Sequence, residues 1–163
     1  MKQSDQVKCP VCGMRVGPHQ NEIIYQQMQF AFCSEQCKAR FLSHPHLYIG
    51  YPGEPAPRQR GQVELKRRRL ALRQPLSVEG AALVQELLSG LMGVNEATAS
   101  GETIEVTYDL LQVSLEELEQ ALTEAGTRLG GDWVERLRRA LIHESEETEI
   151  EAREATPPHH YLP

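Results

Sequence analysis

The sequence lacks any apolar run of the roughly 18 to 20 residues that a helix needs to cross a bilayer. Residues 1–8 are polar and contain no hydrophobic segment of the secretory type. From these two absences we expect a cytoplasmic protein that does not insert into a membrane. No nucleophile–base–orienter set, glycine-rich phosphate loop or paired-carboxylate motif is present either. We therefore expect no enzymatic activity, no catalytic residues and no organic cofactor.

Cysteine is scarce, with four in 163 residues, and all four lie within the first 37 positions. In a reducing compartment, clustered cysteines are more often metal ligands than a disulfide framework. The net charge of −6 gives no general reason to expect nucleic-acid binding. The charge is unevenly spread, because residues 58–73 carry seven Lys or Arg and residues 144–154 carry six Glu. Attraction between these two segments within one molecule would be modest at physiological salt, where screening acts over about 8 Å.

The chain divides by composition into five segments. They are a cysteine-containing unit (1–51), a linker with three prolines and two glycines (52–61), a segment of alternating strand and helix patterns (62–130), an amphipathic helix (131–145) and an acidic tail that we predict to be disordered (146–163). In the amphipathic helix, Trp133, Leu137 and Leu141 share one side, and Trp133 is expected to pack that helix against the sheet.

Along the segment 62–130, apolar residues recur with the spacing of a strand in some places and of a helix in others. The predicted elements are a strand over 64–73, a helix over 77–91, hairpin strands over 94–99 and 103–108, a helix over 114–126 and a short candidate strand over 127–129. Ser77 is the predicted N-cap of the first helix, and Ser114 with Glu117 forms a capping box for the second. The order β-α-β-β-α, with the last strand, predicts a ferredoxin-like βαββα(β) domain, and the whole chain an α+β class.

The strongest signal is the spacing of Cys9, Cys12, Cys33 and Cys37. Two cysteines separated by two residues place both sulfurs on one ion, and Gly13 supplies the backbone freedom of such a knuckle. If Cys33 begins a helix, its sulfur and that of Cys37 lie one turn apart on the same face. Four thiolate ligands are typical of a closed structural zinc site, although thiolates also bind Cu(I) well. A redox Cys-x-x-Cys or four cysteines without a metal are the alternatives.

Residues 7–51 resemble the YHS family, whose relatives include the TRASH metal-binding domains. The resemblance rests on Pro10-Val11-Cys12-Gly13-Met14, on Phe30-Ala31-Phe32-Cys33-Ser34, and on Cys37, Phe41, Pro45 and Tyr48. The spacing of the last three cysteines is similar to the pattern of TRASH domains, which are associated with heavy-metal sensing and trafficking. YHS members usually have Asp in the position of Cys9, so the fourth thiolate favours a closed site. The resemblance implies a treble-clef-like unit of knuckle, hairpin and helix.

Three histidines, His19, His44 and His46, lie in the same segment. With four cysteines available as ligands, we expect these histidines to have ordinary surface roles. His159 and His160 are too isolated to predict a metal site.

Residues 62–130 are similar to a heavy-metal-associated (HMA) domain, the ferredoxin-like module of copper chaperones and P-type metal ATPases. The similarity rests on Leu91-Met92-Gly93-Val94, Val106-Thr107-Tyr108-Asp109, the segment 114–118 and Ala125-Gly126. The family's metal cysteines correspond to Ser77 and Gly80 and its methionine to Pro75, none of which is a soft ligand. The resemblance therefore implies docking to similar domains through charged surfaces. A ferredoxin-like domain unrelated to metals is the alternative.

Together these features predict a non-enzymatic, zinc-stabilised adaptor or accessory protein in heavy-metal handling. One alternative is a Cu(I) or Zn(II) sensor or metallochaperone that exchanges metal at the four thiolates. Another is a zinc-containing nucleic-acid-binding regulator that uses the basic residues 66–73, although no aromatic side chains are interleaved there to stack bases. We expect a protein partner, such as a metal-transporting ATPase or another metal-handling protein, rather than nucleic acid.

Overall fold

The computed structural model describes residues 5–130 and 133–157, except for the side chains of residues 133 and 134. The chain divides into two compact units. Unit 1 comprises residues 1–62 and 153–163, and unit 2 comprises residues 63–152. No helix in the described part of the chain combines the length and the apolar character that a membrane span requires.

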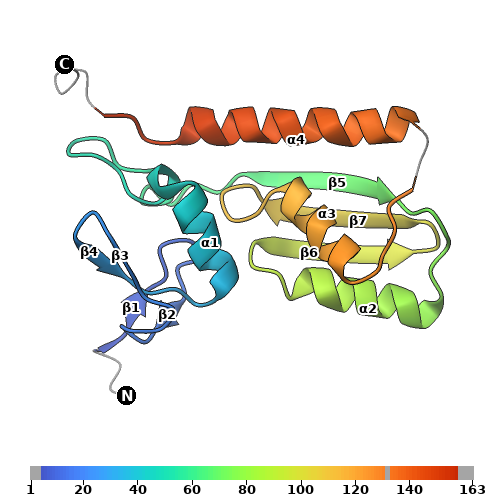
Figure 1. Ribbon diagram of the computed structural model, residues 1–163, viewed down its shortest axis with the longest axis horizontal. Helices are drawn as coiled ribbons and strands as arrows, with labels where there is room; N and C mark the ends of the chain where they lie inside the picture. Colours follow the sequence, from blue (N-terminus) through green and yellow to red (C-terminus); the bar gives the residue numbers. More distant parts are fainter. Residues whose placement is uncertain (1–4, 131–132, 158–163) are drawn as a thin grey trace. The chain divides into compact units, whose positions relative to one another are not determined.

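Unit 1 contains two short hairpins followed by a helix (Figure 1). Its elements are β1 (Val7–Lys8), β2 (Arg15–Val16), β3 (Ile23–Tyr25), β4 (Met28–Phe30), α1 (Glu35–Ser43) and the 3-10 helix η2 (Pro45–Leu47). β1 pairs with β2 and β3 pairs with β4, both antiparallel. This order of knuckle, hairpin and helix is the one that the resemblance to the YHS family implies.

The core of unit 1 is built around the ring of Phe41, which is fully buried on α1. Four aromatic rings lie with their centroids 4.9 to 6.1 Å from it: those of Tyr25, Phe30, Phe32 and Tyr48. Such aromatic pairs add about 0.5 to 1.5 kcal/mol each beyond their buried area. Because most of the chain's few aromatics meet here, a small unit gains a defined core.

The segment 52–61 is not the extended linker that its prolines and glycines predict. Ala56 is fully buried, and the Arg58 backbone N–H donates to the Leu47 carbonyl at 3.0 Å. The Gln59 side-chain oxygen accepts from the N–H groups of Gly50 and Ala56 at 3.0 and 2.8 Å. Proline and glycine here shape tight turns that pack on unit 1, so that unit extends to residue 62.

In its described residues, unit 2 is a three-stranded antiparallel sheet with three helices. Its elements are β5 (Leu65–Ala71), α2 (Val78–Ser89), β6 (Val94–Ser100), β7 (Thr103–Asp109), α3 (Leu115–Glu124) and α4 (Trp133–Arg153). The strand order is β5-β7-β6, with β7 antiparallel to both neighbours. The predicted caps are confirmed: the Ser77 hydroxyl accepts from the Gly80 N–H, and the Ser114 hydroxyl accepts from the Glu117 N–H.

Alternation along β7 separates the two faces of this sheet. Ile104, Val106 and Tyr108 are buried, as are Leu88 of α2 and the three leucines of α3. The intervening residues are only partly exposed and polar, and on this opposite face Arg67 pairs with Glu105 at 3.4 Å. The period of two therefore sets which face forms the core.

The predicted fourth strand is reduced to a single bridge. Leu129 pairs with Leu72 beyond the end of β5, and the Gly130 N–H donates to the Ala71 carbonyl at 2.9 Å. Gly130 is required by this close approach, because a Cβ there would lie 2.5 Å from backbone atoms of residues 72 and 73. The sheet thus has three strands where the ferredoxin-like prediction needs four.

Helix α4 is longer than predicted and packs through a different face. It runs to Arg153, so the helix boundary at 145 is wrong and residues 146–153 are helical rather than disordered. Leu137 and Leu141, on the predicted packing side, are 49% and 57% exposed. Buried Glu146 and Ile150 lie on the packing face instead. The Trp133 side chain, His159 and His160 lie outside the described residues.

Candidate metal centre

The first two cysteines lie in a tight turn between β1 and β2. The Cys9 N–H donates to the Met14 carbonyl at 2.8 Å, and the Gly13 N–H donates to the Cys9 carbonyl at 2.9 Å. Gly13 has a positive φ of 81°, which residues with a side chain rarely adopt. The Arg58 guanidinium donates to the Val11 carbonyl at 2.8 Å and so ties this knuckle to the turns of residues 52–61.

The other two cysteines lie at the beginning of α1. Ser34 is the N-cap, and its hydroxyl accepts from the Cys37 N–H at 3.3 Å. Cys33 therefore precedes the cap instead of beginning the helix, because a serine satisfies the free N–H groups of a first turn better than a cysteine does. The extended backbone at Ser34 still brings the sulfurs of Cys33 and Cys37 to 3.4 Å.

All four cysteine sulfurs lie within 4.8 Å of one another. The Cys33 sulfur is 3.4 Å from those of both Cys12 and Cys37, and no cysteine forms a disulfide. Four sulfurs bound to one zinc ion at about 2.3 Å in a tetrahedron would be about 3.8 Å apart. The observed separations bracket that value, so the arrangement fits a four-thiolate metal site.

The four thiols differ in burial and in protonation. Cys9 and Cys37 are buried, whereas Cys12 and Cys33 are partly exposed. Hydrogen bonds with Cys12 and Cys37 lower the pKa of the Cys9 thiol, whereas hydrogen bonds with Cys12 and Cys9 raise the pKa of the Cys37 thiol. If all four thiols were deprotonated, their negative charges would repel one another at this distance, so the fully deprotonated cluster favours a cation at its centre.

None of the three nearby histidines joins this cluster. His19 pairs with Glu22 at 2.8 Å and His44 with Glu154 at 2.9 Å. The ring of His46 contacts the Ile49 carbonyl and the Tyr51 hydroxyl. Among the described residues, the cysteines alone form a group able to hold a metal. His19 is exposed, as the prediction of surface roles expects, whereas His44 and His46 are half-buried in these contacts.

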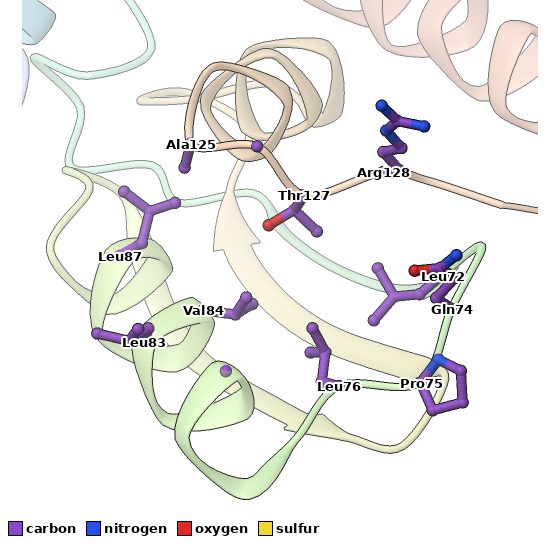
Figure 2. A pocket seen from close by; sticks show the side chains of 12 residues that line it. Leu72, Gln74, Pro75, Leu76, Leu83, Val84, Leu87, Ala125, Thr127 and Arg128 are labelled. Atoms are coloured by element: carbon purple, nitrogen blue, oxygen red, sulfur yellow. The ribbon is translucent and has the colours of Figure 1, made fainter.

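Two of the three positions that the expected HMA resemblance assigns to metal ligands border a cavity in unit 2. This cavity of about 560 Å³ lies between α2 and residues 125–128, and Figure 2 shows Leu76, Leu83, Val84 and Leu87 on its walls. Pro75 and Gly80 line it, and the Ser77 hydroxyl is occupied as a helix cap. The cavity therefore offers a metal no thiol or thioether from these positions.

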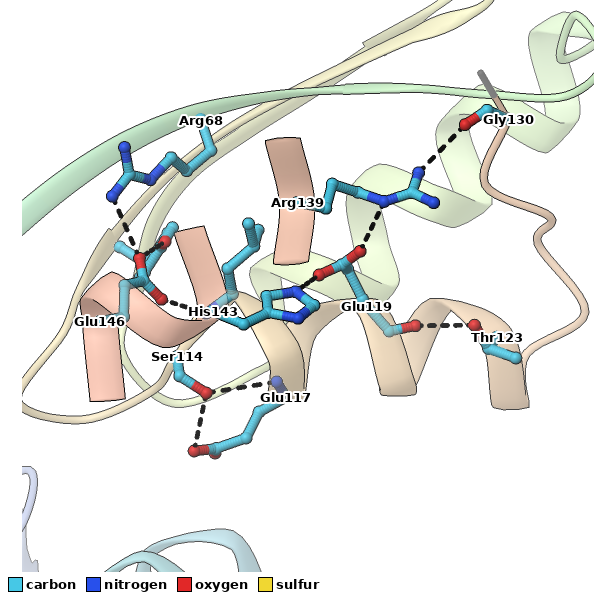
Figure 3. Close-up of polar contacts among 11 residues, drawn as sticks. Arg68, Ser114, Glu117, Glu119, Thr123, Gly130, Arg139, His143 and Glu146 are labelled. Atoms are coloured by element: carbon cyan, nitrogen blue, oxygen red, sulfur yellow. Dashed lines mark hydrogen bonds and ion pairs between the residues drawn. The ribbon is translucent and has the colours of Figure 1, made fainter. Parts of the chain in front are cut away.

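Sequence reasoning missed a buried carboxylate in unit 2, that of Glu146. Its oxygens accept from the Tyr108 hydroxyl, from the Arg68 guanidinium at 3.3 Å and from the Leu115 N–H at 2.8 Å (Figure 3). Burial, followed by the hydrogen bond to Glu146, raises the pKa of Tyr108. One signal was available, because residues 139, 143, 146 and 150 recur at helical spacing although three of them are polar.

The basic run of β5 is divided between the two faces of the sheet. Lys66 and Arg68 point to the helix side, where they pair with Glu149 at 2.8 Å and Glu146 at 3.3 Å. The predicted attraction between the basic and acidic segments is thus present, as ion pairs between β5 and α4. Arg67 lies on the other face. The run therefore does not form one continuous cationic surface.

The geometry of residues 7–51 defines a small cysteine-cluster unit of the kind that binds metal. The same residues match the family model of the YHS domain, which covers less than a third of the chain. Comparison of the whole chain with curated proteins and with solved structures finds no match. Nothing in these comparisons supports the HMA-like or TRASH-like expectations, which stay predictions.

Proposed function

We propose that the four cysteines hold one zinc ion that stabilises unit 1, and that the chain serves as a non-enzymatic adaptor or accessory in heavy-metal handling. The convergence of four sulfurs within 4.8 Å carries the metal part of this proposal. A unit of this size gains little from apolar burial alone. Zinc binding to structural sites, worth about 10 to 16 kcal/mol, would exceed that contribution.

A closed zinc site is favoured over an open one by the ligand set. Four thiolates leave no coordination position for water on a tetrahedral ion, so the ion would act on the fold rather than on a substrate. Cys9 and Cys37 are buried, which protects two of the four bonds from exchange. A treble-clef-like arrangement, with the knuckle and α1 each supplying two ligands, is consistent with this role.

The adaptor role rests on the pairing of this unit with a domain that resembles HMA modules but lacks their ligands. A cytoplasmic metal-handling protein, such as a metal-transporting ATPase, is the proposed partner. NMR titration of the full chain with an HMA domain of such an ATPase tests this. Saturable shifts confined to a surface of unit 2 are expected, and the absence of shifts at millimolar partner concentration would contradict it.

The metal site itself is tested by elemental analysis combined with a count of reactive thiols. One zinc per chain and four protected thiols are expected in the native protein, and C12S is expected to lose most of the zinc. M14S is the matched control, because Met14 is a neighbouring sulfur side chain that is 53% exposed. Zinc-free protein with four reactive thiols under reducing conditions would overturn the proposal.

The partial exposure of Cys12 and Cys33 favours a second candidate, a site that exchanges Zn(II) or Cu(I). An incoming chelator or protein thiol can reach an exposed sulfur without unfolding the unit. Competition with a strong chelator separates the two candidates. Release at the rate of global unfolding of unit 1 indicates a structural ion, whereas release from folded protein within seconds indicates exchange.

A further inference from the structure

A polar cavity of about 820 Å³ opens in unit 2 beside the C-terminal end of α3. Its walls are formed by Arg73, which follows β5, by α3 and α4, and by residues 126–129. The ionisable side chains that line it are Arg73, Glu116, Glu119, Arg128, Arg139 and His143. It belongs to a single unit and is separate from the cysteine cluster. Its volume is in the range of small-molecule sites.

Arg73 and Arg128 lie directly opposite each other on neighbouring segments of this wall. The Leu72–Leu129 bridge sets the register, and the Arg73 N–H donates to the Arg128 carbonyl at 3.1 Å. Directly opposed residues project to the same face, and like charges in that position destabilise the pairing. Among the described residues, neither guanidinium forms an ion pair. Two exposed cations without an ion pair to any described residue are therefore held on opposed positions.

A third arginine reaches the cavity from α4. The Nε of Arg139 lies 3.1 Å from the Glu119 carboxylate, and the same guanidinium donates to the Gly130 carbonyl at 3.1 Å (Figure 3). His143 contacts the same carboxylate of Glu119. These contacts hold Arg139 in place. Because the Glu119 carboxylate is paired with Arg139 and His143, it does not neutralise Arg73 or Arg128.

The charge at this cavity is positive in an otherwise acidic protein. Three arginines face two glutamates, which leaves one positive charge, or two when His143 is protonated. The C-terminal end of α3 carries only about half a negative charge. Beyond the Arg139–Glu119 pair, Arg73 and Arg128 face Glu116, and the half-charge is smaller than the one positive charge that remains. A ligand with at least one full negative charge would complete the site.

We infer that this cavity binds a phosphate group, either free or carried on a small ester. A planar guanidinium group can donate two parallel hydrogen bonds to an oxyanion. Arg73 and Arg128 together could therefore bind several oxygens of one phosphate group. Arg73 and Arg128 would bind the phosphate oxygens. The remaining volume would accommodate the organic part of an ester.

The inference is tested by titrating the full chain with inorganic phosphate and with adenosine monophosphate, by NMR at constant ionic strength. Saturable shifts at residues 73 and 126–129 are expected. R73Q/R128Q is expected to weaken binding by about tenfold or more. R67Q/R69Q removes the same charge from β5 residues that do not line the cavity, and it is expected to leave binding within about twofold. Tighter binding of one probe identifies free phosphate or an ester as the ligand.

Two outcomes would overturn the inference. One is the lack of saturable binding of either probe, and the other is equal weakening in both double variants, which would indicate general charge attraction. The thermal midpoint of ligand-free protein gives a second readout. The R73Q/R128Q variant lacks the two opposed like charges, so its thermal midpoint is expected to be higher than that of the wild type. A lower midpoint with unchanged binding would mean that the arginines only stabilise the end of α3.

Discussion

The guanidinium of Arg68 on β5 donates to the carboxylate of Glu146 on α4 at 3.3 Å, although 78 residues separate them in the chain. Arg68 Nε is buried without a hydrogen-bond partner among the described residues, so Glu146 is central to keeping this cation satisfied. Because the same carboxylate also accepts from Tyr108 and Leu115, one side chain connects α4 to β5, β7 and α3. Helix α4 is thus held largely by polar contacts.

Replacing this carboxylate is expected to release α4. The E146Q variant leaves the half-buried Arg68 without a counter-charge, which costs about 3 kcal/mol when a buried pair is broken. Hydrogen exchange across residues 135–153 measures the loss of protection. E147Q is the matched control, because the neighbouring side chain is exposed and its replacement should change stability by less than about 0.5 kcal/mol. Equal protection in the two variants would contradict this role of Glu146.

Unit 2 is expected to lose stability in alkaline solution through Tyr108. Its pKa is raised in the folded state by burial and by the Glu146 carboxylate, so folding favours the neutral phenol. The contribution of Tyr108 to the free energy of unfolding is fully present below the pKa of an unfolded tyrosine, about 10. It decreases as the pH rises from there towards the pKa of the folded state. The slope expected for one group is about 1.4 kcal/mol per pH unit. Urea unfolding of unit 2 between pH 9 and 11 measures it.

The Y108F variant isolates this titration. It removes the ionisable hydroxyl, so the difference in free energy of unfolding between wild type and variant should shrink steadily above pH 10. A constant difference across that range would show that the pKa of Tyr108 is the same in the folded and unfolded states.

The local features of unit 2 could be read from sequence because their causes are local. Ser77 and Ser114 cap their helices through side-chain bonds to N–H groups three residues away. Likewise, alternation along β7 buries Ile104, Val106 and Tyr108 because successive strand residues face opposite ways. Neither effect depends on a distant part of the chain.

The features that sequence did not predict depend on distant partners. In the sequence, Glu146 is one of many acidic residues in a predicted tail. Its burial becomes favourable through its contacts with Arg68, Tyr108 and the start of α3. Similarly, residues 52–61 have the composition of a flexible linker, yet Arg58 bonds to the Val11 carbonyl 47 positions away. Charge and proline content alone cannot distinguish a solvated segment from a packed one.

Truncating Phe41 is expected to disrupt unit 1. Its ring meets four others, so F41A should lower the stability of this unit by about 3 to 5 kcal/mol and weaken zinc retention with it. L42A is the matched control on the same helix, because Leu42 is 52% exposed. Thermal unfolding of unit 1, followed by NMR, compares the two. A loss in L42A as large as that in F41A would contradict a core centred on Phe41.

Removing the metal is expected to unfold unit 1 and to spare unit 2. Without the cation, no shared ion would join the knuckle to α1, whereas the core of unit 2 contains no cysteine. Hydrogen exchange before and after chelation measures this, with loss of protection expected across residues 7–49 and little change across 65–124. Unchanged protection in unit 1 would show that the ion does not stabilise the fold.

The contacts of residues 154 and 155 have a consequence for synthesis on the ribosome. Glu154 pairs with His44, and the Ala155 N–H donates to the His46 carbonyl, so unit 1 includes residues that are translated more than 90 positions after its first 62. The cysteines emerge early and can capture an ion while the rest is still being made. If the proposed metal binds, the nascent unit would rely on it until residues 154 and 155, which follow α4, have left the exit tunnel.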